Sequence, residues 1–312
     1  MVRVPTVILE KDGNPILGYF LKEKLVSLTY IDDIDDKVDG LTMVFSKFFI
    51  PPKEGDKIKL YLGYDGMVED MGEFYPIGVR EDYGSFTMEV KLTPVDFSKP
   101  IKQKRTKSYK DIKLSALVAK VAGRNGLKSK VTVEDITIKS KQQSGQSDIA
   151  FLKSIAQEYN ATFAIKSSTV ILAPKASSKD RDKLPKISLT LADMIELEIE
   201  YSYKSKYKSA EAKYRDTEKN KDITVKVGGE EPKLVVEGSF KSDADAKAKV
   251  QAKLDKANGG TVEGSFSTTA SVTAGAMLTL VLPDRTIEHL QIKQVQHTVS
   301  SSGYIKQVKF TK

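Results

Sequence analysis

The sequence QSDIAFLKSIAQEYNATFAIKSSTVILAP, residues 146–174, decides the fold predicted for the middle of the chain. Ser147 is a suitable N-cap, because its hydroxyl can accept an otherwise unpaired backbone N–H of the first helical turn. The charge of Asp148 suits the positive end of the helix dipole. Two short strands, 162–165 and 169–173, are predicted to follow. One apolar helix face is predicted from residues at helical spacing: Ile149, Leu152, Ile155, Ala156 and Tyr159. We therefore predict a helix packed on a hairpin.

Composition limits the classes of protein to which the chain can belong. Its 312 residues suffice for two or three domains with cores of their own. The sequence contains no cysteine, which excludes disulfides, thiolate zinc sites and cysteine nucleophiles. Its apolar runs fall short of the roughly 18 residues that a membrane helix requires, and residues 1–15 lack the features of a signal peptide. We expect a chain that is made in the cytoplasm and stays soluble.

The net charge of +8 is distributed unevenly along the chain. Residues 1–100 carry 12 basic and 18 acidic side chains, residues 101–186 carry 19 and 7, and residues 187–312 carry 19 and 17. A basic insert between two less basic parts is the division that these counts favour. Such an insert suits either a solvated surface or contact with an acidic partner, which can be nucleic acid or the acidic face of a protein.

Residues 1–100 are expected to form β structure without a helix. Apolar and polar residues alternate in several short stretches with turn residues between them, which is typical of a small barrel or sandwich. The stretches are 16–30, 41–50, 57–64, 72–80 and 86–92. The acidic residues between Asp32 and Asp36 are expected to form a solvated turn, because the glycine and the downstream glutamate of a calcium loop are missing.

A small α/β module is expected to follow the first β domain. The basic stretch 101–113, IKQKRTKSYKDIK, is expected to be a connection, and it suits either a solvated linker or a nucleic-acid-binding arm. A helix that Ser115 can cap is predicted to stop at Asn125-Gly126. The polar stretch 174–187, which is bracketed by prolines, is expected to lead into a second β domain.

The second β domain is predicted to begin with a strand that has one apolar and one acidic face. Glu196, Glu198 and Glu200 alternate there with apolar residues, so the acidic face is expected to meet water or a lumen. Stretches 210–214, 223–227 and 234–240 are expected to continue the same sheet. A helix over 243–256 carries only a thin apolar stripe and is expected to lie on the surface.

Catalytic patterns are sparse in this sequence. His289 and His297 are its two histidines, without an HExxH pattern or a third ligand nearby, which argues against a zinc enzyme. His297 lies in an alternating strand and is expected to be a structural or interface residue. The sequence shows neither a Gly-x-Ser-x-Gly elbow nor a Walker loop. We expect no enzyme, no metal site, no catalytic residues and no cofactor.

Several segments, in order, resemble one known family. They are GDKIKLYLGYDG (55–66) with MGEFYPIGV (71–79) and GSFTMEVKLTPVDF (84–97), Arg105–Tyr109 with LSALVAKVAGRNGL (114–127), SDIAFLKSIAQEYNATFAI (147–165), and AGAMLTLVLPD (274–284) with EHLQIKQVQHTVSSSGYIKQVKF (288–310). In this order they resemble the phage late control protein D family, the baseplate hub of contractile-tailed phages and of related pyocin-like particles. The resemblance covers nearly the whole chain.

The resemblance implies a mainly β fold with an α+β insert. Two tube-like β-barrel domains of the phage tail-hub type, 1–100 and 188–312, are then interrupted by a basic α/β module, 101–176, and a linker, 177–187. The implied function is that of a structural hub in the virion. Three copies would form a ring that adapts the sixfold tail tube to the threefold spike and encloses a channel for DNA or effectors. The implied partners are a second and third copy, the tail tube protein, the spike protein and other baseplate proteins.

In such a ring the candidate residues serve interfaces rather than chemistry. Glu196, Glu198 and Glu200 are expected to line the lumen, where like charge keeps passing DNA from binding. A contact with neighbouring baseplate proteins is expected from four basic residues: Lys102, Lys104, Arg105 and Lys107. Two other functions stay open. The basic insert suits a nucleic-acid-binding protein, although Tyr109 is the one aromatic residue in the basic run, and a cell-wall-binding or cell-wall-degrading tail protein is the other alternative.

Overall fold

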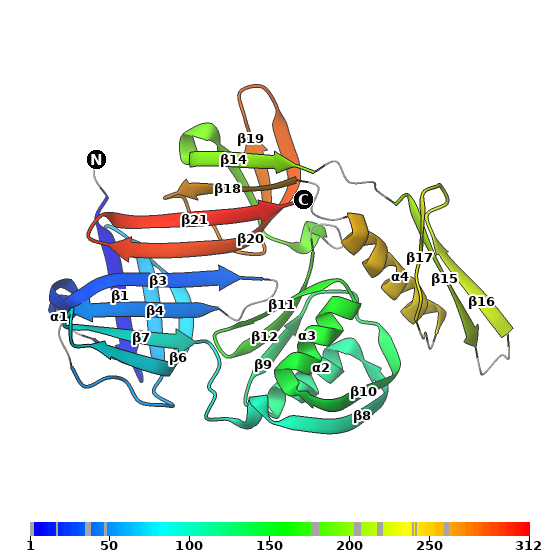
Figure 1. The fold of residues 1–312 in the computed structure, drawn as a ribbon, viewed down its shortest axis with the longest axis horizontal. Helices are drawn as coiled ribbons and strands as arrows, with labels where there is room; N and C mark the ends of the chain where they lie inside the picture. Colours follow the sequence, from blue (N-terminus) through cyan, green and yellow to red (C-terminus); the bar gives the residue numbers. More distant parts are fainter. Residues whose placement is uncertain are drawn as a thin grey trace.

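The computed structural model shows a long β body with two smaller α/β units beside it (Figure 1). It describes residues 3–16, 18–34, 39–46, 49–175, 181–202, 207–216, 221–238, 240, 242–258 and 262–312. Within these ranges, none of the helices is both long and apolar enough to cross a membrane.

The β body is built from both ends of the chain. Its N-terminal elements are β1 (Pro5–Lys11), β2 (Asn14–Pro15), α1 (Gly18–Lys24), β3 (Leu25–Asp33), β4 (Gly40–Ser46), β5 (Ile58–Tyr64), β6 (Met67–Asp82) and β7 (Thr87–Thr93). Its C-terminal elements are β13 (Lys186–Thr190), the 3-10 turn η3 (Leu191–Asp193), β14 (Ile195–Tyr201), β18 (Val262–Thr268), β19 (Met277–Val281), β20 (Thr286–Ser300) and β21 (Gly303–Thr311). The strands run in the order β14-β18-β21-β20-β3-β4-β7-β6-β5-β1-β2, and β13 and β19 branch from β20.

The two halves of the body meet where β3 pairs with β20. The pairing is antiparallel and places Asp32 opposite Val295 and Tyr30 opposite His297. The packing also crosses this seam, because Tyr304 of β21 joins the N-terminal core cluster and its backbone carbonyl accepts a hydrogen bond from Tyr64 Oη at 2.6 Å. The two predicted β domains therefore share one continuous sheet.

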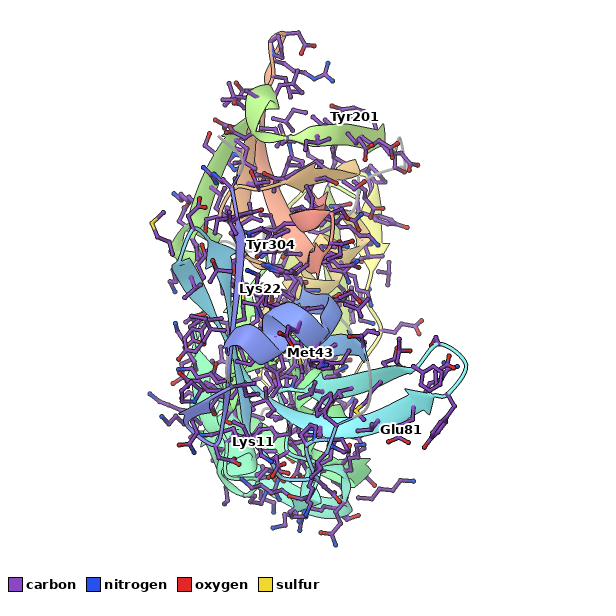
Figure 2. The ribbon with its side chains drawn as sticks, turned by 90° about the vertical axis from the view of Figure 1, so that its left-hand side faces the viewer. Lys11, Lys22, Met43, Glu81, Tyr201 and Tyr304 are labelled. Carbon is purple, nitrogen blue, oxygen red and sulfur yellow. The ribbon has the colours of Figure 1, made fainter. Side chains whose placement is uncertain are left out.

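The long strand β6 turns the corner of the N-terminal half. Residues 67–74 pair with β5, whereas residues 75–82 pair with β7. Figure 2 shows the β6–β7 hairpin, which carries Glu81, projecting from the body. The expectation of no helix before residue 100 was wrong. α1 forms because Leu21 is buried in the core while Lys22 and Lys24 lie in the last turn, where the helix dipole favours positive charge.

The insert contains two helices and two small sheets. Its elements are η1 (Pro100–Lys102), β8 (Lys104–Lys113), α2 (Leu114–Gly123), β9 (Lys128–Val131), β10 (Thr137–Ser147), α3 (Asp148–Glu158), β11 (Ala161–Lys166), β12 (Thr169–Pro174) and, in the connection back to the body, η2 (Arg181–Lys183). β8 pairs with β10, and β11-β12-β9 form the second sheet.

The helix on a hairpin predicted for 146–174 is confirmed. Ser147 Oγ accepts the Ala150 amide at 3.2 Å, and α3 buries Phe151, Leu152 and Ile155 in one core cluster with the β11–β12 hairpin. The prediction that 101–113 is only a connection was wrong. Residues 104–113 form β8, because Tyr109 points into the insert core while the residues around it stay exposed.

A second α/β unit lies beside the insert. It consists of β15 (Ser209–Asp216), β16 (Lys221–Val227), β17 (Lys233–Val235) and α4 (Asp243–Asn258). The expectation that these strands continue the C-terminal sheet was wrong, since they form a separate sheet in the order β16-β15-β17. The small side chains Ala210 and Ala212 give β15 a shallow inner face, on which the narrow stripe of Ala246 and Val250 of α4 packs.

Gly264 is required by the close contact between β14 and β18. A Cβ at this position would lie 2.3 Å from the Glu198 carbonyl oxygen and 2.4 Å from Phe310 Cζ. We predict that Gly264→Ala lowers the free energy of unfolding by about 1–3 kcal/mol, measured by urea denaturation, because backbone and ring must both move. Gly40→Ala in β4 is the matched control, because nothing lies within 4 Å of its added Cβ. Equal stability of the two variants would contradict this packing.

Candidate functional site

Three parts of the chain meet at Asp32, near the end of β3. Lys166 of β11 forms an ion pair with Asp32 Oδ1. From the C-terminal half, the Ala274 amide donates to Asp32 Oδ2 at 2.9 Å and Thr273 Oγ1 lies 3.4 Å from the same oxygen. Asp32 is 4% exposed. The solvated turn expected for 32–36 was therefore wrong at Asp32, and residues 35 and 36 lie outside the described part.

The turn between β11 and β12 brings Lys166 to this junction. Ser167 and Ser168 both adopt positive φ angles, 44° and 56°, which make the turn tight. Ser167 Oγ lies only 2.9 Å from the point where a Cβ of Gly72 would stand, and Gly72 itself has φ of +107°. A glycine at position 72 therefore allows the insert to approach β6 closely. Figure 1 shows the β11–β12 hairpin reaching toward the ends of β3 and β4.

A second buried carboxylate lies beside the first. Asp39 accepts hydrogen bonds from Tyr30 Oη at 3.2 Å and from the Asp33 amide at 3.0 Å. Burial, together with the nearby charge of Asp32, raises the pKa of Asp39 to about 7, although Lys166 acts in the opposite direction. The junction therefore contains two acidic groups and one ammonium group, and one acid titrates near neutral pH.

His297 lies on β20, opposite Tyr30 of β3, and is a neutral group. Its Nδ1 is 2.6 Å from Tyr304 Oη, and its ring lies 5.2 Å from that of Tyr30 between centroids. Burial, assisted by the charge of Lys306, lowers the pKa of His297 to about 4. The environment fits the structural role expected for His297, whereas His289 is about half exposed beside Glu288. No described group of three or more His, Cys, Asp or Glu side chains could hold a metal ion.

The predicted acidic residues lie on β14, an edge strand that pairs only with β18 among the described strands. Glu198 and Glu200 are exposed and stand opposite Ser265 and Glu263. Glu196 has a φ of 55° and lies in a bulge, so the regular alternation stops there. The structure therefore groups Glu198 and Glu200 with Glu263, a residue that the sequence pattern did not single out.

The four predicted basic residues do not form one surface. Lys104 and Lys107 are exposed on β8, and the Lys102 ammonium lies 3.5 Å from the ring centroid of Phe97. Arg105 instead turns inward, with Nε 3.8 Å from an oxygen of the fully buried Asp148. Only part of the predicted contact surface is therefore available to a partner.

Asp148 is the centre of a polar network in the core of the insert. Its carboxylate accepts hydrogen bonds from Arg124 at 3.0 Å, Asn125 at 2.8 Å and Gln143 at 2.9 Å. Arg124 also donates to Tyr109 Oη at 2.9 Å. The sequence indicated Asp148 only as a favourable charge at a helix N-terminus. Its hydrogen-bond partners are 5 to 24 residues away along the chain, so no local pattern could identify the network.

The insert and the α4 unit are joined by charged groups around a pocket of about 260 Å³. Lys249 of α4 lies 2.5 Å from Glu158 of α3 and 3.0 Å from Asp245. Tyr159 Oη donates to Asp245 at 3.1 Å, and Lys141 of β10 also pairs with Glu158. These oppositely charged groups pair with one another and hold α4 against the C-terminal end of α3.

The fold is that of phage tail proteins. The prophage MuSo2 43 kDa tail protein from Shewanella oneidensis superposes with a TM-score of 0.70 and 13% identity over 98% of both chains. A tail protein from Neisseria meningitidis MC58 gives a TM-score of 0.71 with 11% identity over 99% of this chain and 96% of that one. The E. coli c3393 protein, a component of the type VI secretion system, gives 0.60 with 11% identity over 97% and 76%.

The predicted resemblance to phage baseplate hub proteins is confirmed by two curated relatives. The probable baseplate hub protein of Escherichia phage 186 is 25% identical over 232 residues, which are 72% of this chain and 59% of that protein. Its counterpart in Escherichia phage P2 is 24% identical over 197 residues, 61% and 51% of the two chains. This chain thus matches little more than half the length of these relatives. No family model matches it.

We predict that Asp148→Ala destabilises the protein by about 3 kcal/mol, because the partly buried Arg124 loses its counter-charge and the buried Asn125 and Gln143 lose an acceptor. Urea denaturation followed by circular dichroism measures this loss. Asp182→Ala, which removes a carboxylate 81% exposed, is the control and is expected to change stability by less than about 0.5 kcal/mol. A small effect at Asp148 would show that the network is not stabilising.

Proposed function

We propose that the protein is a structural baseplate hub of a contractile phage tail or of a related phage-like particle. The proposal is supported by curated relatives that carry this name and by tail proteins of the same fold over nearly the whole chain. The role is structural rather than enzymatic, and the protein acts in the tail baseplate of the virion after synthesis in the host cytoplasm. Its domains are the two β halves 1–100 and 188–312, the insert 101–176 and the linker 177–187.

The observation that carries this proposal is the continuous sheet across the β3–β20 seam. Four strands on each side of the seam run in the order β14-β18-β21-β20-β3-β4-β7-β6. In the described chain, β14 and residues 75–82 of β6 form the outer edges of this eight-stranded segment, and each pairs with a strand on its inner side only. Unpaired edges offer backbone hydrogen-bonding groups to another strand. Tyr201 and Glu81, which belong to the two edges, lie far apart in Figure 2.

Pairing of these two edges between neighbouring copies produces a ring. The contact is heterologous, because β14 of one copy meets β6 of the next, and such contacts close when the rotation fits. Three copies give six similar β units around one channel. This arrangement matches a sixfold tail tube protein on one side and a threefold spike protein on the other.

The acidic edge strand suits the wall of the channel. Glu198, Glu200 and Glu263 are exposed neighbours on β14 and β18, and Glu196 lies at the adjoining bulge. Negative side chains repel phosphate groups, so DNA would pass during genome ejection without binding specifically.

We predict that the purified chain forms trimers of about three times its 34.5 kDa mass. Because the sequence has no cysteine, Val79→Cys combined with Glu198→Cys allows specific cross-linking of the two edges with a short bis-maleimide. A trimer band on a denaturing gel is expected for this variant, and the unsubstituted chain is expected to form a ring in electron micrographs with Glu198 and Glu200 on its inner wall. Val79→Cys with Lys130→Cys of the insert is the control. A chain that stays monomeric at tens of micromolar, without a trimer band, would contradict the ring.

The exposed lysines of β8 are proposed to contact other baseplate proteins. Lys104, Lys107 and Lys110 are exposed along this strand. Tyr109, the aromatic residue that a nucleic-acid-binding surface would need for stacking, is 4% exposed and lies in the insert core. An acidic protein face therefore fits this surface better than a single-stranded nucleic acid does.

We predict that Lys104→Glu with Lys107→Glu reduces the yield of assembled particles at least tenfold without lowering the melting temperature, because reversed charge repels an acidic partner. Particle counts by electron microscopy measure the effect. Lys128→Glu with Lys130→Glu on β9 is the control, with exposed lysines on another strand of the insert. Normal assembly of the β8 variant would exclude this contact, and salt-dependent DNA binding that the variant abolishes would indicate nucleic acid instead.

A further inference from the structure

The two outer edges of the eight-stranded segment around the seam run in opposite directions. Every step from one strand to the next, from β14 to residues 75–82 of β6, is antiparallel, and there are seven such steps. Tyr201 on β14 and Glu81 on β6 lie far apart in Figure 2, so the two edges of one copy do not meet each other. Rotation about the axis of a ring keeps the direction of each strand relative to that axis. In the proposed ring, β14 of one copy therefore meets β6 of the next as an antiparallel neighbour.

The ladder registers also show which side chains share a face of this segment. Residues opposite each other in a ladder project to the same face, and so do residues two apart along a strand. Followed across the seven steps, one face carries Glu198 of β14, Lys309 of β21, Asp33 of β3, Lys91 of β7 and Arg80 of β6. None of these residues belongs to a core cluster of the β body, and both Glu198 and Arg80 are exposed. The two edges thus carry opposite charges on the same face.

These two charged side chains are not paired within one copy. In the described part of the chain, Arg80 and Glu198 form neither a salt bridge nor a side-chain hydrogen bond. Glu89 stands opposite Arg80 on β7, but its carboxylate lies 3.0 Å from the ammonium of Lys91. The carboxylate of Asp82 accepts backbone amides of the hairpin turn. The guanidinium of Arg80 is therefore available to a carboxylate from another strand.

The opposite side of each edge is apolar and incompletely covered. Val79 stands opposite the fully buried Val90, yet its own side chain is 39% exposed. Ile199 packs against the C-terminal core cluster but is only half-buried, and Tyr201 on the same strand is 40% exposed. A strand that joins either edge removes apolar surface from water, which favours association.

We propose that Arg80 of one copy forms an ion pair with Glu198 of the next copy, in an antiparallel register that places Val79 opposite Ile199. The inference rests on the proposed ring, and it names the residues that set the register of the contact between copies. On the exposed face the edge strands contribute opposite charges, and on the core face they contribute two apolar side chains. An exposed ion pair adds little affinity by itself, so its main effect is to select one register among several.

Other registers lose this complementarity. A shift by one residue turns the charged side chains of one strand toward the apolar side chains of the other. A shift by two residues places Asp82 opposite Glu198, and like charges directly opposite each other are unfavourable. The same shift in the other direction places Gly78, which has no side chain, opposite Glu198. In the proposed register Asp82 comes level with Glu196, but the bulge and the positive φ of 55° take Glu196 out of the regular ladder.

We test the ion pair by sedimentation velocity of the full chain, which gives the concentration at which half of the chains are in trimers. Arg80→Glu and Glu198→Arg each place like charges opposite one another and are expected to raise this concentration at least about tenfold. The variant with both substitutions restores the pair with its charges exchanged and is expected to return to within about threefold of the unsubstituted chain. Lys110→Glu, at an exposed lysine of β8 outside both edges, is the control and is expected to leave the concentration unchanged.

Two further variants test the register. Arg80→Glu with Glu200→Arg is expected to remain weakened, because Glu200 stands opposite Gly78 in the proposed register.

Disulfide cross-linking locates the opposite residues directly, since the sequence contains no other cysteine. Opposite residues of an antiparallel ladder have Cβ atoms about 4.5–5.5 Å apart, close to the distance that a disulfide requires. Val79→Cys with Ile199→Cys is expected to give a disulfide-linked trimer on mild oxidation. Val79→Cys with Tyr201→Cys, two residues out of register, is the control and is expected to give none.

The outcomes separate the ion pair from the ring itself. A trimer that neither single charge reversal weakens, or one that Glu200→Arg restores in the Arg80→Glu chain, would overturn the ion pair and leave the ring. Linkage through Tyr201→Cys in place of Ile199→Cys would overturn the register. An unsubstituted chain that stays monomeric would overturn the ring and the ion pair together.

Discussion

The antiparallel pairing of β3 with β20 is the constraint on which the rest of the structure depends. It joins strands about 270 residues apart in the chain and aligns Tyr30 with His297 and Asp32 with Val295. The pairing makes one sheet from two halves, and it leaves β14 and residues 75–82 of β6 as the two outer edges of the eight-stranded segment around the seam. It also fixes the position of Asp32, because that residue lies in the paired part of β3. The proposed ring and the contact of Lys166 with Asp32 therefore both depend on one backbone register.

The buried charged groups at the β3–β20 seam interact in a different way from the apolar side chains of the core. Apolar packing stabilises each half through its own cluster, with few polar atoms involved. The ion pair between Lys166 and Asp32 instead connects units that are already folded. A buried pair of this kind adds little net stability because desolvation opposes the attraction, but it defines one arrangement of the units.

Sequence reasoning predicted local structure well where one element buries one face. The α3 helix with the β11–β12 hairpin follows directly from the capping by Ser147 and from apolar spacing, because both are short-range effects. It failed for α1, whose seven residues were predicted as part of a strand. Only the buried position of Leu21 distinguishes a helix from a strand in this segment. It also failed for β15 and β16, which alternate as sheet strands do and carry no sign of which sheet they join.

The sequence by itself determined the mainly β composition, the basic insert and the order of segments that resembles phage baseplate hub proteins. These properties are set by residue type and by spacing along the chain. Only the tertiary structure decided that Asp32 is buried against Lys166, that Arg105 turns toward Asp148, and that Glu263 joins Glu198 and Glu200. The physical reason is distance along the chain. Lys166 is 134 residues from Asp32, and electrostatic partners so far apart are chosen by sheet register and domain contact, which no local pattern records.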